Sequence, residues 1–313
     1  MRILVTGKNG ALGKAIMKLS VLNTFPHAEF IFTDSKSLEL TNKKQVEDFF
    51  HVNKPNYVLH LASKSGVAKL NESIPAEIFD TNMTMSMNIL SAASKNNVSK
   101  IVLVSSSAAY PAQLGRSAQE SDLHAGSPRQ VDFAYAYAKR MMDPLAQAYR
   151  NQFDMKVSVA IVNGIVGPYM NFKPNESFML AGMIRRFCEQ KISEARSSNY
   201  QVFGNSKAER EYTYSEDLAK AILWLVSQNK MPPLINLGNN LNLSIKDYAE
   251  IICDCLEIDK DLLEFSGHFN QISDLNNFLT DNSLFISLSN FQYTDIYEAV
   301  DNTITWFRKN YNL

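Results

Sequence analysis

The first half of the chain alternates short apolar runs with longer stretches in which apolar residues recur at helical spacing. The apolar runs predict strands at residues 1–6, 29–33, 57–61, 101–104 and 157–162. The amphipathic stretches predict helices at residues 14–22, 43–53, 82–95 and 135 to about 150. Strands that alternate with helices in this way form a parallel sheet with helices on both faces. We therefore predict an α/β fold with a doubly wound parallel sheet of the Rossmann type.

The pattern changes in the second half of the chain. Beyond Gly167-Pro168 the segments are rich in loops, and the expected helices at 178–191 and 244–256 are shorter. The apolar run at 234–237 is expected to return to the first sheet or to its margin. We predict a dinucleotide-binding domain, residues 1–163 plus about 205–237, and a smaller, discontinuous C-terminal substrate domain, residues 164–204 and 238–313. The smaller domain would cover the carboxyl ends of the strands, where open α/β sheets bind ligands.

A glycine-rich turn follows the first strand directly. Gly7, Gly10 and Gly13 have the spacing of a dinucleotide-binding βαβ unit. In such a unit the glycines allow a tight turn, a close approach of the backbone to a pyrophosphate, and close packing of helix on strand. The phosphates would lie against the positive end of the helix that follows. A glycine-rich turn without a ligand is the alternative interpretation.

Composition narrows the class of protein. The 313 residues, 45% of them hydrophobic, suffice for one large or two modest domains. The net charge of −1 comes from well-mixed charges without a basic stripe, so we expect no nucleic-acid partner. No apolar run approaches the ~20 residues that a membrane span needs, and we expect no membrane association.

The cysteines and the amino terminus bear on the compartment. Cys188, Cys253 and Cys255 have neither paired spacing nor histidine partners, so we expect buried or partly buried thiols, no disulfide scaffold and no metal site. A strand at residues 1–6 predicts that no signal peptide precedes the fold. We therefore expect a soluble protein in a reducing compartment, the cytoplasm.

Tyr135 and Lys139 are candidate catalytic residues. They are four residues apart in a predicted helix, so the phenol and the ammonium lie one turn apart. A nearby cation favours the phenolate and makes the tyrosine a proton donor or acceptor near neutral pH. Such pairs also occur on solvated helices. Here the glycine turn and a serine cluster, Ser105-Ser106-Ser107, directly after the fourth strand favour an active site.

Several further segments accompany these motifs: Leu61-Ala62-Ser63-Lys64, Val98-Ser99-Lys100, Ser106-Ser107-Ala108-Ala109-Tyr110-Pro111, Gly167-Pro168, Asn171-Phe172, Arg185-Arg186-Phe187 and Arg210-Glu211-Tyr212. With them, nearly the full chain resembles the extended short-chain dehydrogenases/reductases, the NAD-dependent epimerase/dehydratase family. Within that family it is similar to the GDP-L-fucose synthases. The resemblance implies an NADPH-dependent enzyme that acts on a GDP-linked 4-keto sugar in surface-polysaccharide biosynthesis.

The resemblance also implies roles for individual residues. Tyr135 would protonate the keto oxygen of the sugar, Lys139 would lower the pKa of Tyr135 and hold the nicotinamide ribose, and Ser106 would hydrogen-bond the same keto oxygen. The residues expected to bind the cofactor are Gly7, Asn9, Gly10, Ala11, Leu12, Gly13, Asp34, Lys36, Leu61, Ala62 and Lys139. The residues expected to bind the nucleotide sugar are Ser107, Ala108, Asn171, Phe178, Arg185, Arg186, Phe203 and Arg210.

Two departures from the fucose synthases decide the predicted reaction. Those enzymes use a cysteine two residues after the catalytic serine and a histidine ahead of the double arginine to invert two ring carbons. The corresponding residues here are Ala108 and Phe178, and neither a methyl nor a phenyl group exchanges protons. We therefore predict reduction at C4 without 3,5-epimerisation. His124 could replace the missing base, although a solvated loop histidine is the favoured interpretation.

Other reactions stay open to different degrees. A bifunctional fucose synthase with relocated groups and an NAD-dependent 4-epimerase both share the catalytic trio. A dehydratase is disfavoured because Ser107 and Ala108 offer no carboxylate after the catalytic hydroxyl. An NADP(H)-sensing binding protein is disfavoured because such proteins commonly lack the Tyr135–Lys139 pair.

Several residues bear on the choice between NADH and NADPH and on the choice of nucleotide. Asp34 could accept a hydrogen bond from a ribose 2′-hydroxyl, which favours NADH, whereas Lys8 and Lys36 could pair with a 2′-phosphate. The family's loop arginine is replaced by Asn9, and NADPH is still preferred. Phe203 replaces a tryptophan at the base-binding end. GDP is nevertheless preferred over UDP or dTDP.

Two further expectations come from the resemblance. A late lysine of the family has no equivalent near residues 276–278. A homodimer is expected in which the helices at 82–95 and 136–150 of two copies form a four-helix bundle.

Overall fold

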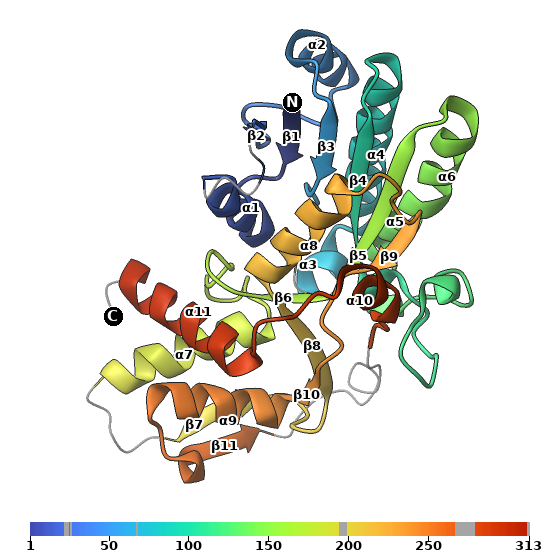
Figure 1. Ribbon diagram of the computed structural model, residues 1–313. Coiled ribbons are helices and arrows are strands. Elements are labelled where there is room, and N and C mark those ends of the chain that lie inside the picture. Colours follow the sequence, from blue (N-terminus) through green and yellow to red (C-terminus); the bar gives the residue numbers. More distant parts are fainter. Residues whose placement is uncertain (22–24, 26, 67, 194–198, 267–278, 312–313) are drawn as a thin grey trace.

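The computed structural model describes residues 1–21, 25, 27–66, 68–193, 199–266 and 279–311. At its centre is a six-stranded sheet in the order β2-β1-β3-β4-β5-β9, with every neighbouring pair parallel (Figure 1). Its strands are β1 (Arg2–Thr6), β2 (Glu29–Thr33), β3 (Tyr57–His60), β4 (Lys100–Ser106), β5 (Lys156–Val162) and β9 (Leu234–Asn236). The predicted Rossmann-type fold is confirmed, and so is the return of the apolar run at 234–237 to this sheet.

Helices cover both faces of the sheet. The apolar residues of α1 (Ala11–Val21) and α8 (Ser215–Ser227) pack on one face. Those of α2 (Lys43–Asn53), α4 (Pro75–Lys95) and α6 (Met142–Phe153) pack on the other. The helix predicted to run from Tyr135 to about 150 is two helices, α5 (Phe133–Arg140) and α6, which meet at Met141. Helix α4 begins before the predicted residue 82, with Pro75 in its first turn, where proline fits a helix best.

The remaining elements build a smaller part below the carboxyl ends of the sheet (Figure 1). Its strands are β6 (Gly164–Val166), β7 (Tyr200–Phe203), β8 (Glu209–Tyr214), β10 (Asn242–Ser244) and β11 (Leu263–Ser266). Its main helices are α7 (Met179–Ile192), α9 (Ile245–Leu256) and α11 (Ile296–Tyr311). Short elements complete the chain: α3 (Ala68–Ser73), α10 (Ser283–Ser289), η1 (Ser107–Ala109), η2 (Glu120–Asp122), η3 (Gln130–Asp132) and η4 (Lys260–Leu262).

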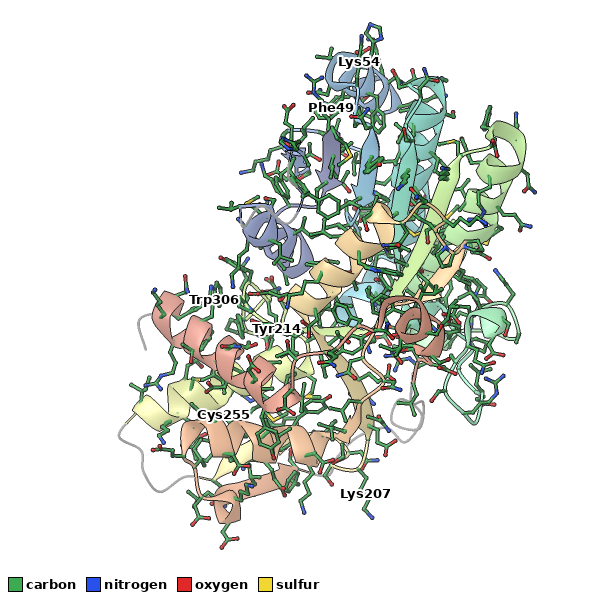
Figure 2. The ribbon with its side chains drawn as sticks, in the orientation of Figure 1. Phe49, Lys54, Lys207, Tyr214, Cys255 and Trp306 are labelled. Atoms are coloured by element: carbon green, nitrogen blue, oxygen red, sulfur yellow. The ribbon has the colours of Figure 1, made fainter. Side chains whose placement is uncertain are left out.

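The smaller part has its own apolar core, in which side chains of α7, α9 and α11 pack together. Strand β8 pairs with β6 and β10, and its Tyr212 and Tyr214 belong to this core. The predicted first domain includes residues 205–237, and strand β8 of that range pairs with strands of the smaller part. Figure 2 labels Tyr214, Cys255 and Trp306 in this region. As expected, Cys188 and Cys253 are buried thiols and Cys255 is partly buried. The division into two domains stays a prediction.

The order of the strands reverses beside β1. The chain passes from β1 to β2 on one side and then from β2 to β3 on the other side of β1, which makes this a topological switch point. Ligands of open α/β sheets bind at such a switch point. Among the described residues, no helix is long and apolar enough to span a bilayer.

Candidate active site

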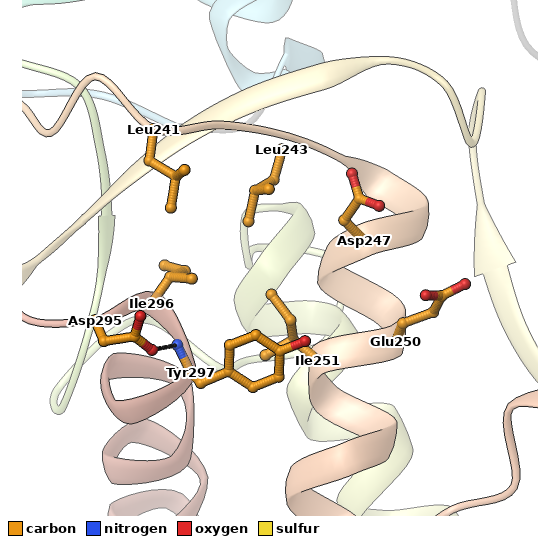
Figure 3. Close-up of a pocket in the computed structure, with 8 residues that line it drawn as sticks. All are labelled: Leu241, Leu243, Asp247, Glu250, Ile251, Asp295, Ile296 and Tyr297. Carbon is orange, nitrogen blue, oxygen red and sulfur yellow. Dashed lines mark hydrogen bonds between the residues drawn. The ribbon is translucent and has the colours of Figure 1, made fainter.

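A hollow on the smaller part does not suit a phosphorylated ligand. It measures about 330 Å³ and has an apolar wall formed by Leu243, Ile251 and their neighbours (Figure 3). Three carboxylates line it: Asp247, Glu250 and Asp295. These three carboxylates would repel a pyrophosphate, so this hollow is not the expected cofactor site. That site is expected at the carboxyl edge of the large sheet.

At that edge the glycine turn is pressed against the segment that follows β3. Gly7 has a φ of +76°, and a Cβ placed on it would come within 2.9 Å of the Ala62 backbone. The Thr6 hydroxyl accepts a hydrogen bond from the Ala62 N–H at 3.1 Å. A Cβ on Gly13 would approach the Gly7 carbonyl oxygen to 2.4 Å. Both glycines are therefore required by the packing of strand, turn and helix, as their spacing predicted.

Gly10 is different. A Cβ there would meet only the Gly7 carbonyl oxygen, at an ordinary 3.7 Å, so the protein itself does not require glycine at this position. The residue stands directly before α1, whose first N–H groups have no partner within the helix and carry partial positive charge. Open space beside a helix start fits the pyrophosphate of a dinucleotide, and the residues of this turn thus fit the expected cofactor. Ala11 and Leu12 form the first turn of that helix.

An acidic and a basic side chain lie together at the end of β2. The Asp34 carboxylate accepts hydrogen bonds from the Ser37 N–H and from the Asn9 amide, both at 3.0 Å. The Lys8 ammonium lies 3.3 Å from the same carboxylate. Hydrogen bonds from Ser37 first, then from Asn9 and Lys8, hold the pKa of Asp34 well below its usual range. Lys36 is exposed in the same turn. The end of β2 thus offers both a carboxylate that could accept a hydrogen bond from a ribose 2′-hydroxyl and a cation that could pair with a 2′-phosphate.

The candidate catalytic residues Ser106, Tyr135 and Lys139 come together at the end of β4 and on α5. The Ser106 hydroxyl accepts a hydrogen bond from the Ala108 N–H at 3.2 Å, and its interaction with the phenol acts to lower the pKa of Tyr135. The Lys139 ammonium donates to the Val104 carbonyl at 2.9 Å and lies 5.9 Å from the centroid of the Tyr135 ring. The three groups therefore share one site.

Burial tunes the acidity of two of these residues. It raises the pKa of Tyr135, and hydrogen bonds with Ser106 and Ser63 oppose that rise without cancelling it. The expected lowering of the Tyr135 pKa by Lys139 stays a prediction, because desolvation sets the net direction. Burial also lowers the pKa of Lys139 to about 7, so its ammonium releases its proton near neutral pH.

Two residues of this region received no role from the sequence. Ser63 follows β3 and acts to lower the pKa of Tyr135, and Asn163 follows β5. The Asn163 amide donates to Glu211 at 3.1 Å and accepts from the Thr213 hydroxyl at 2.6 Å. The signal that would have found both is their position, because each polar residue follows a strand of the sheet as Ser106 ends β4.

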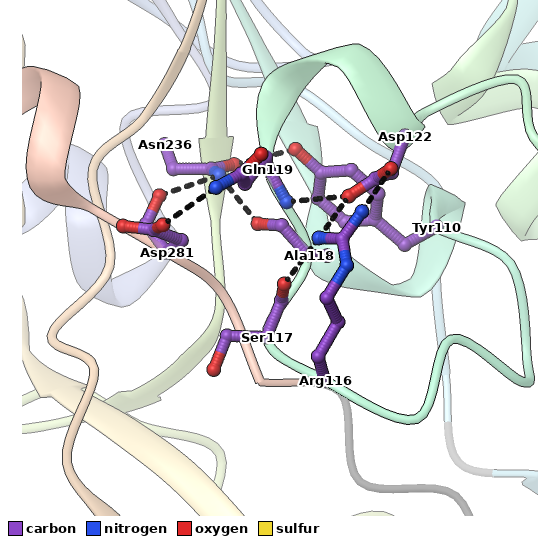
Figure 4. A network of polar contacts seen from close by, with 8 residues as sticks. All are labelled: Tyr110, Arg116, Ser117, Ala118, Gln119, Asp122, Asn236 and Asp281. Atoms are coloured by element: carbon purple, nitrogen blue, oxygen red, sulfur yellow. Dashed lines mark hydrogen bonds and ion pairs between the residues drawn. The ribbon is translucent and has the colours of Figure 1, made fainter.

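A buried network fixes the loop that follows Ser106, the candidate catalytic serine (Figure 4). The Tyr110 hydroxyl donates to the Asn236 side-chain oxygen at 2.7 Å. The Asn236 amide in turn donates to the carbonyls of Ala118 at 3.0 Å and Asp281 at 2.9 Å. Three segments distant in sequence are thereby held against β9, which gives the wall beside Ser106 a defined position.

Four further residues expected at the substrate lie in η1 or in the smaller part. Ser107 is buried and Ala108 partly buried in η1. Phe178 stands directly before α7 with 53% of its surface exposed. Asn171, expected at the substrate, is exposed and bonds within its own loop, donating to the Glu176 carbonyl at 3.3 Å.

The arginines expected at the nucleotide sugar lie in the smaller part. Arg185 and Arg186 are on α7, and the Arg186 guanidinium stands 4.7 Å over the ring of Phe203. Burial, followed by the neighbouring Arg185, lowers the pKa of Arg186. Arg210 on β8 donates to the Glu209 carbonyl at 2.7 Å. The structure thus brings Arg186 and Phe203 together. Residues 276–278, where we looked for the family's late lysine, lie outside the described residues.

His124 pairs with a carboxylate on α6. Its imidazole lies 3.0 Å from the Asp143 carboxylate on α6, and 51% of its side chain is exposed. Asp143 follows Tyr135 by about two helical turns. This surface pairing agrees with the solvated loop histidine that we favoured.

Comparison with known proteins adds independent findings. The model of the "NAD dependent epimerase/dehydratase family" matches residues 3–238. GDP-L-fucose synthase of Dictyostelium discoideum is 29% identical over 99% of this chain and 96% of its own length. GDP-L-colitose synthase of Yersinia pseudotuberculosis is 31% identical over 82% of both chains. The crystal structure of a GDP-L-fucose synthetase from Naegleria fowleri bound to NADP superposes with a TM-score of 0.86 at 26% identity, covering 99% of this chain and 95% of that one. The predicted family and the predicted enzyme class, NAD(P)-dependent, are confirmed.

Proposed function

Because the chain belongs to the NAD dependent epimerase/dehydratase family, we propose that it is an NADPH-dependent C4 reductase of a GDP-linked 4-keto sugar. The sugar would be a 6-deoxyhexose or a heptose, and the reaction would proceed without 3,5-epimerisation. One observation carries the proposal: Ser106, Tyr135 and Lys139 share one site, while Ala108 and Phe178 stand where epimerisation groups are expected.

The protein groups have separate tasks in this reaction. When bound, the nicotinamide supplies the hydride. Tyr135 gives its proton to the keto oxygen, and the Ser106 hydroxyl holds that oxygen by a hydrogen bond. Lys139 is the group expected at the ribose. Its pKa of about 7 lets it take up or release a proton beside the tyrosine at working pH.

The lack of epimerisation follows from side-chain chemistry. Inversion of a ring carbon needs one group to remove the carbon-bound hydrogen and another to deliver a proton to the opposite face. Ala108 lies two residues after Ser106, and Phe178 stands before the helix that carries Arg185 and Arg186. Neither side chain has a titratable group. The keto oxygen can thus be reduced while the neighbouring carbons keep their hydrogens.

Three features support the cofactor and the nucleotide. Lys8 offers a cation beside the end of β2, and the Naegleria fowleri relative binds NADP. The relatives from Dictyostelium discoideum and Yersinia pseudotuberculosis are named for GDP-linked sugars. Arg186 together with Phe203 offers a cation and an aromatic face to a nucleoside diphosphate.

A bifunctional GDP-L-fucose synthase is the second candidate. It is favoured by the name of the Dictyostelium discoideum relative, which matches over nearly the whole of both chains. This reading requires groups other than Ala108 and Phe178 to move the ring protons.

Isotope incorporation separates the two candidates. The enzyme is given NADPH and a GDP-linked 4-keto-6-deoxyhexose in deuterated water, and the product is examined by NMR beside an enzyme-free incubation. We expect no enzyme-dependent deuterium at C3 or C5, with Tyr135→Phe abolishing turnover. Enzyme-dependent deuterium at both carbons, or an inverted product, would establish the second candidate instead.

We further propose that the enzyme is a cytoplasmic homodimer that serves surface-polysaccharide biosynthesis. The expected four-helix bundle is supported by exposed apolar side chains on its helices, Met87 with 42% and Met141 with 38% of their surface exposed. Sedimentation equilibrium tests the dimer directly: a monomer at micromolar concentration would contradict it.

A further inference from the structure

The hydroxyl of Ser105 binds the main chain of α5. Side chains alternate between the two faces of a strand, and on β4 Ile101 and Leu103 belong to the apolar core on the face of α4 and α6. Ser105 continues that face with a polar group and is 2% exposed. Its hydroxyl donates to the Lys139 carbonyl at 2.9 Å. Because a buried hydroxyl without a partner is costly, this bond fixes the hydroxyl on Lys139.

The Lys139 carbonyl is available because α5 ends one residue later. Helix α5 stops at Arg140, and Pro144 explains the stop, since proline has no N–H and its ring crowds the carbonyl four residues before it. Carbonyls in the last turn of a helix lack their usual helical donors, and Lys139 belongs to that turn. The Ser105 hydroxyl supplies a donor at this point.

The side chain of Lys139 is held by the same strand. Its ammonium donates to the Val104 carbonyl at 2.9 Å, and Val104 directly precedes Ser105. Two neighbouring residues of β4 thus hold both ends of Lys139, the main-chain carbonyl and the ammonium. The stem between these ends is flexible in a free lysine, and two fixed ends leave it few conformations.

We propose that Ser105 is a positioning residue for Lys139, which holds the main chain of α5 so that the ammonium stands at a fixed place beside Tyr135 and the cofactor. The proposal rests on the proposed function, in which Lys139 is the group at the nicotinamide ribose. The place of the ammonium matters, because a hydrogen bond weakens steeply when its distance or angle departs from the ideal. Ser105 therefore acts through Lys139 and not on the substrate itself.

Removal of the Ser105 hydroxyl should release Lys139 without displacing α5. The next residue, Arg140, donates to the Ala109 carbonyl and to the Gly126 carbonyl, both at 2.7 Å. These two bonds join the end of α5 to the segment that follows β4, and they remain when Ser105 is changed to alanine. The expected effect of that change is therefore local to Lys139.

The first test is a binding cycle that needs no keto sugar. Calorimetry measures the NADPH affinity of Ser105→Ala, of Lys139→Met and of the variant that carries both changes. We expect Ser105→Ala to weaken binding by about fivefold and Lys139→Met by at least about tenfold. The double variant should bind no more weakly than Lys139→Met, because Ser105 acts through the ammonium that is then absent. Losses that multiply in the double variant, or wild-type affinity in Ser105→Ala, would overturn the proposal.

Ser158→Ala is the matched control for this cycle. Ser158 is 0% exposed on the neighbouring β5, and its hydroxyl donates to the Pro232 carbonyl at 2.6 Å. Both alanine variants remove one buried hydroxyl from the sheet and should lose similar stability in urea unfolding, but only Ser105→Ala should lose NADPH affinity. Ser105→Thr keeps the hydroxyl and should bind NADPH as the wild type does. Equal NADPH affinities of the two alanine variants would leave Ser105 with a structural role alone.

The second test is kinetic and depends on the proposed function. With a GDP-linked 4-keto sugar and saturating NADPH, Ser105→Ala should lower kcat by about fivefold, with KM for the sugar unchanged. If the wild type reduces no keto sugar, the proposed function fails while the binding cycle still decides the role of Ser105. An active wild type beside a Ser105→Ala variant with the same kcat and the same NADPH affinity would refute the positioning role alone.

Discussion

The burial of Lys139 predicts that the folded protein is less stable at neutral pH than it would be without this ammonium. The side chain is 3% exposed, and burial lowers its pKa from the ordinary 10.5 to about 7. Between these two values the unfolded chain holds a proton that the folded chain has released. Stability therefore rises with pH in this window, and the cost is largest below pH 7.

The size of the effect follows from the shift. A difference of about 3.5 pKa units corresponds to about 5 kcal/mol at low pH, about 4 kcal/mol at pH 7 and about 2 kcal/mol at pH 9. Lys139→Met keeps the aliphatic stem but loses the hydrogen bond to the Val104 carbonyl, which costs about 1 kcal/mol. Lys139→Met should then exceed the wild type in stability by about 3 kcal/mol at pH 7 and by about 1 kcal/mol at pH 9.

Urea unfolding of the free proteins at pH 7 and pH 9 measures this gap. Lys207→Met removes a charge from an exposed position and should leave the difference between the two pH values as in the wild type. A gap between Lys139→Met and wild type that is equal at both pH values would refute the reasoning, because it would mean that Lys139 titrates alike in folded and unfolded chains.

Two further predictions concern the glycine turn and the buried network. Gly10→Ala should fold with unchanged stability and lose at least about tenfold in NADPH affinity, because its methyl group enters space that only a ligand needs. Gly13→Ala should instead melt at lower temperature, since its Cβ would lie 2.4 Å from the Gly7 carbonyl oxygen. Calorimetry and thermal melts distinguish the two, and equal behaviour would contradict both. Tyr110→Phe leaves the Asn236 oxygen without its phenol donor, so it should cost about 1–3 kcal/mol in urea unfolding while NADPH affinity stays at the wild-type value. A stability equal to wild type would contradict this reading of the network.

The large sheet could be predicted because its signals are local. Each strand is a short apolar run followed by an amphipathic helix, and the glycine turn marks the first crossover. The proximity of Ser106, Tyr135 and Lys139 could be predicted for the same reason, because Tyr135 and Lys139 are one helical turn apart and Ser106 ends a strand. Their catalytic role stays a prediction. The net direction of the Tyr135 pKa could not be predicted in this way. Desolvation depends on everything that packs around a group, and spacing along the chain does not report it.

The smaller part was only outlined because its contacts join distant segments. Strand β6 has three residues, too few for a periodic pattern, and it pairs with β8 some fifty positions later. Asn163 was missed for a related reason. Its partners Glu211 and Thr213 lie about fifty residues later on β8. An asparagine after a strand gives no sign of such partners in the sequence.

The fold does not depend on Ala108 and Phe178, the two positions that determine the proposed reaction. Phe178 is 53% exposed before α7, and Ala108 is partly exposed in η1; neither belongs to an apolar core of the described residues. By contrast, the residues that hold the loop after Ser106 in place are buried: Tyr110 and Asn236 are hydrogen-bonded to each other. A substitution at the exposed pair therefore changes which ring protons can move at little cost in stability. Under the proposed function, this scaffold has lost epimerisation and retains ketone reduction.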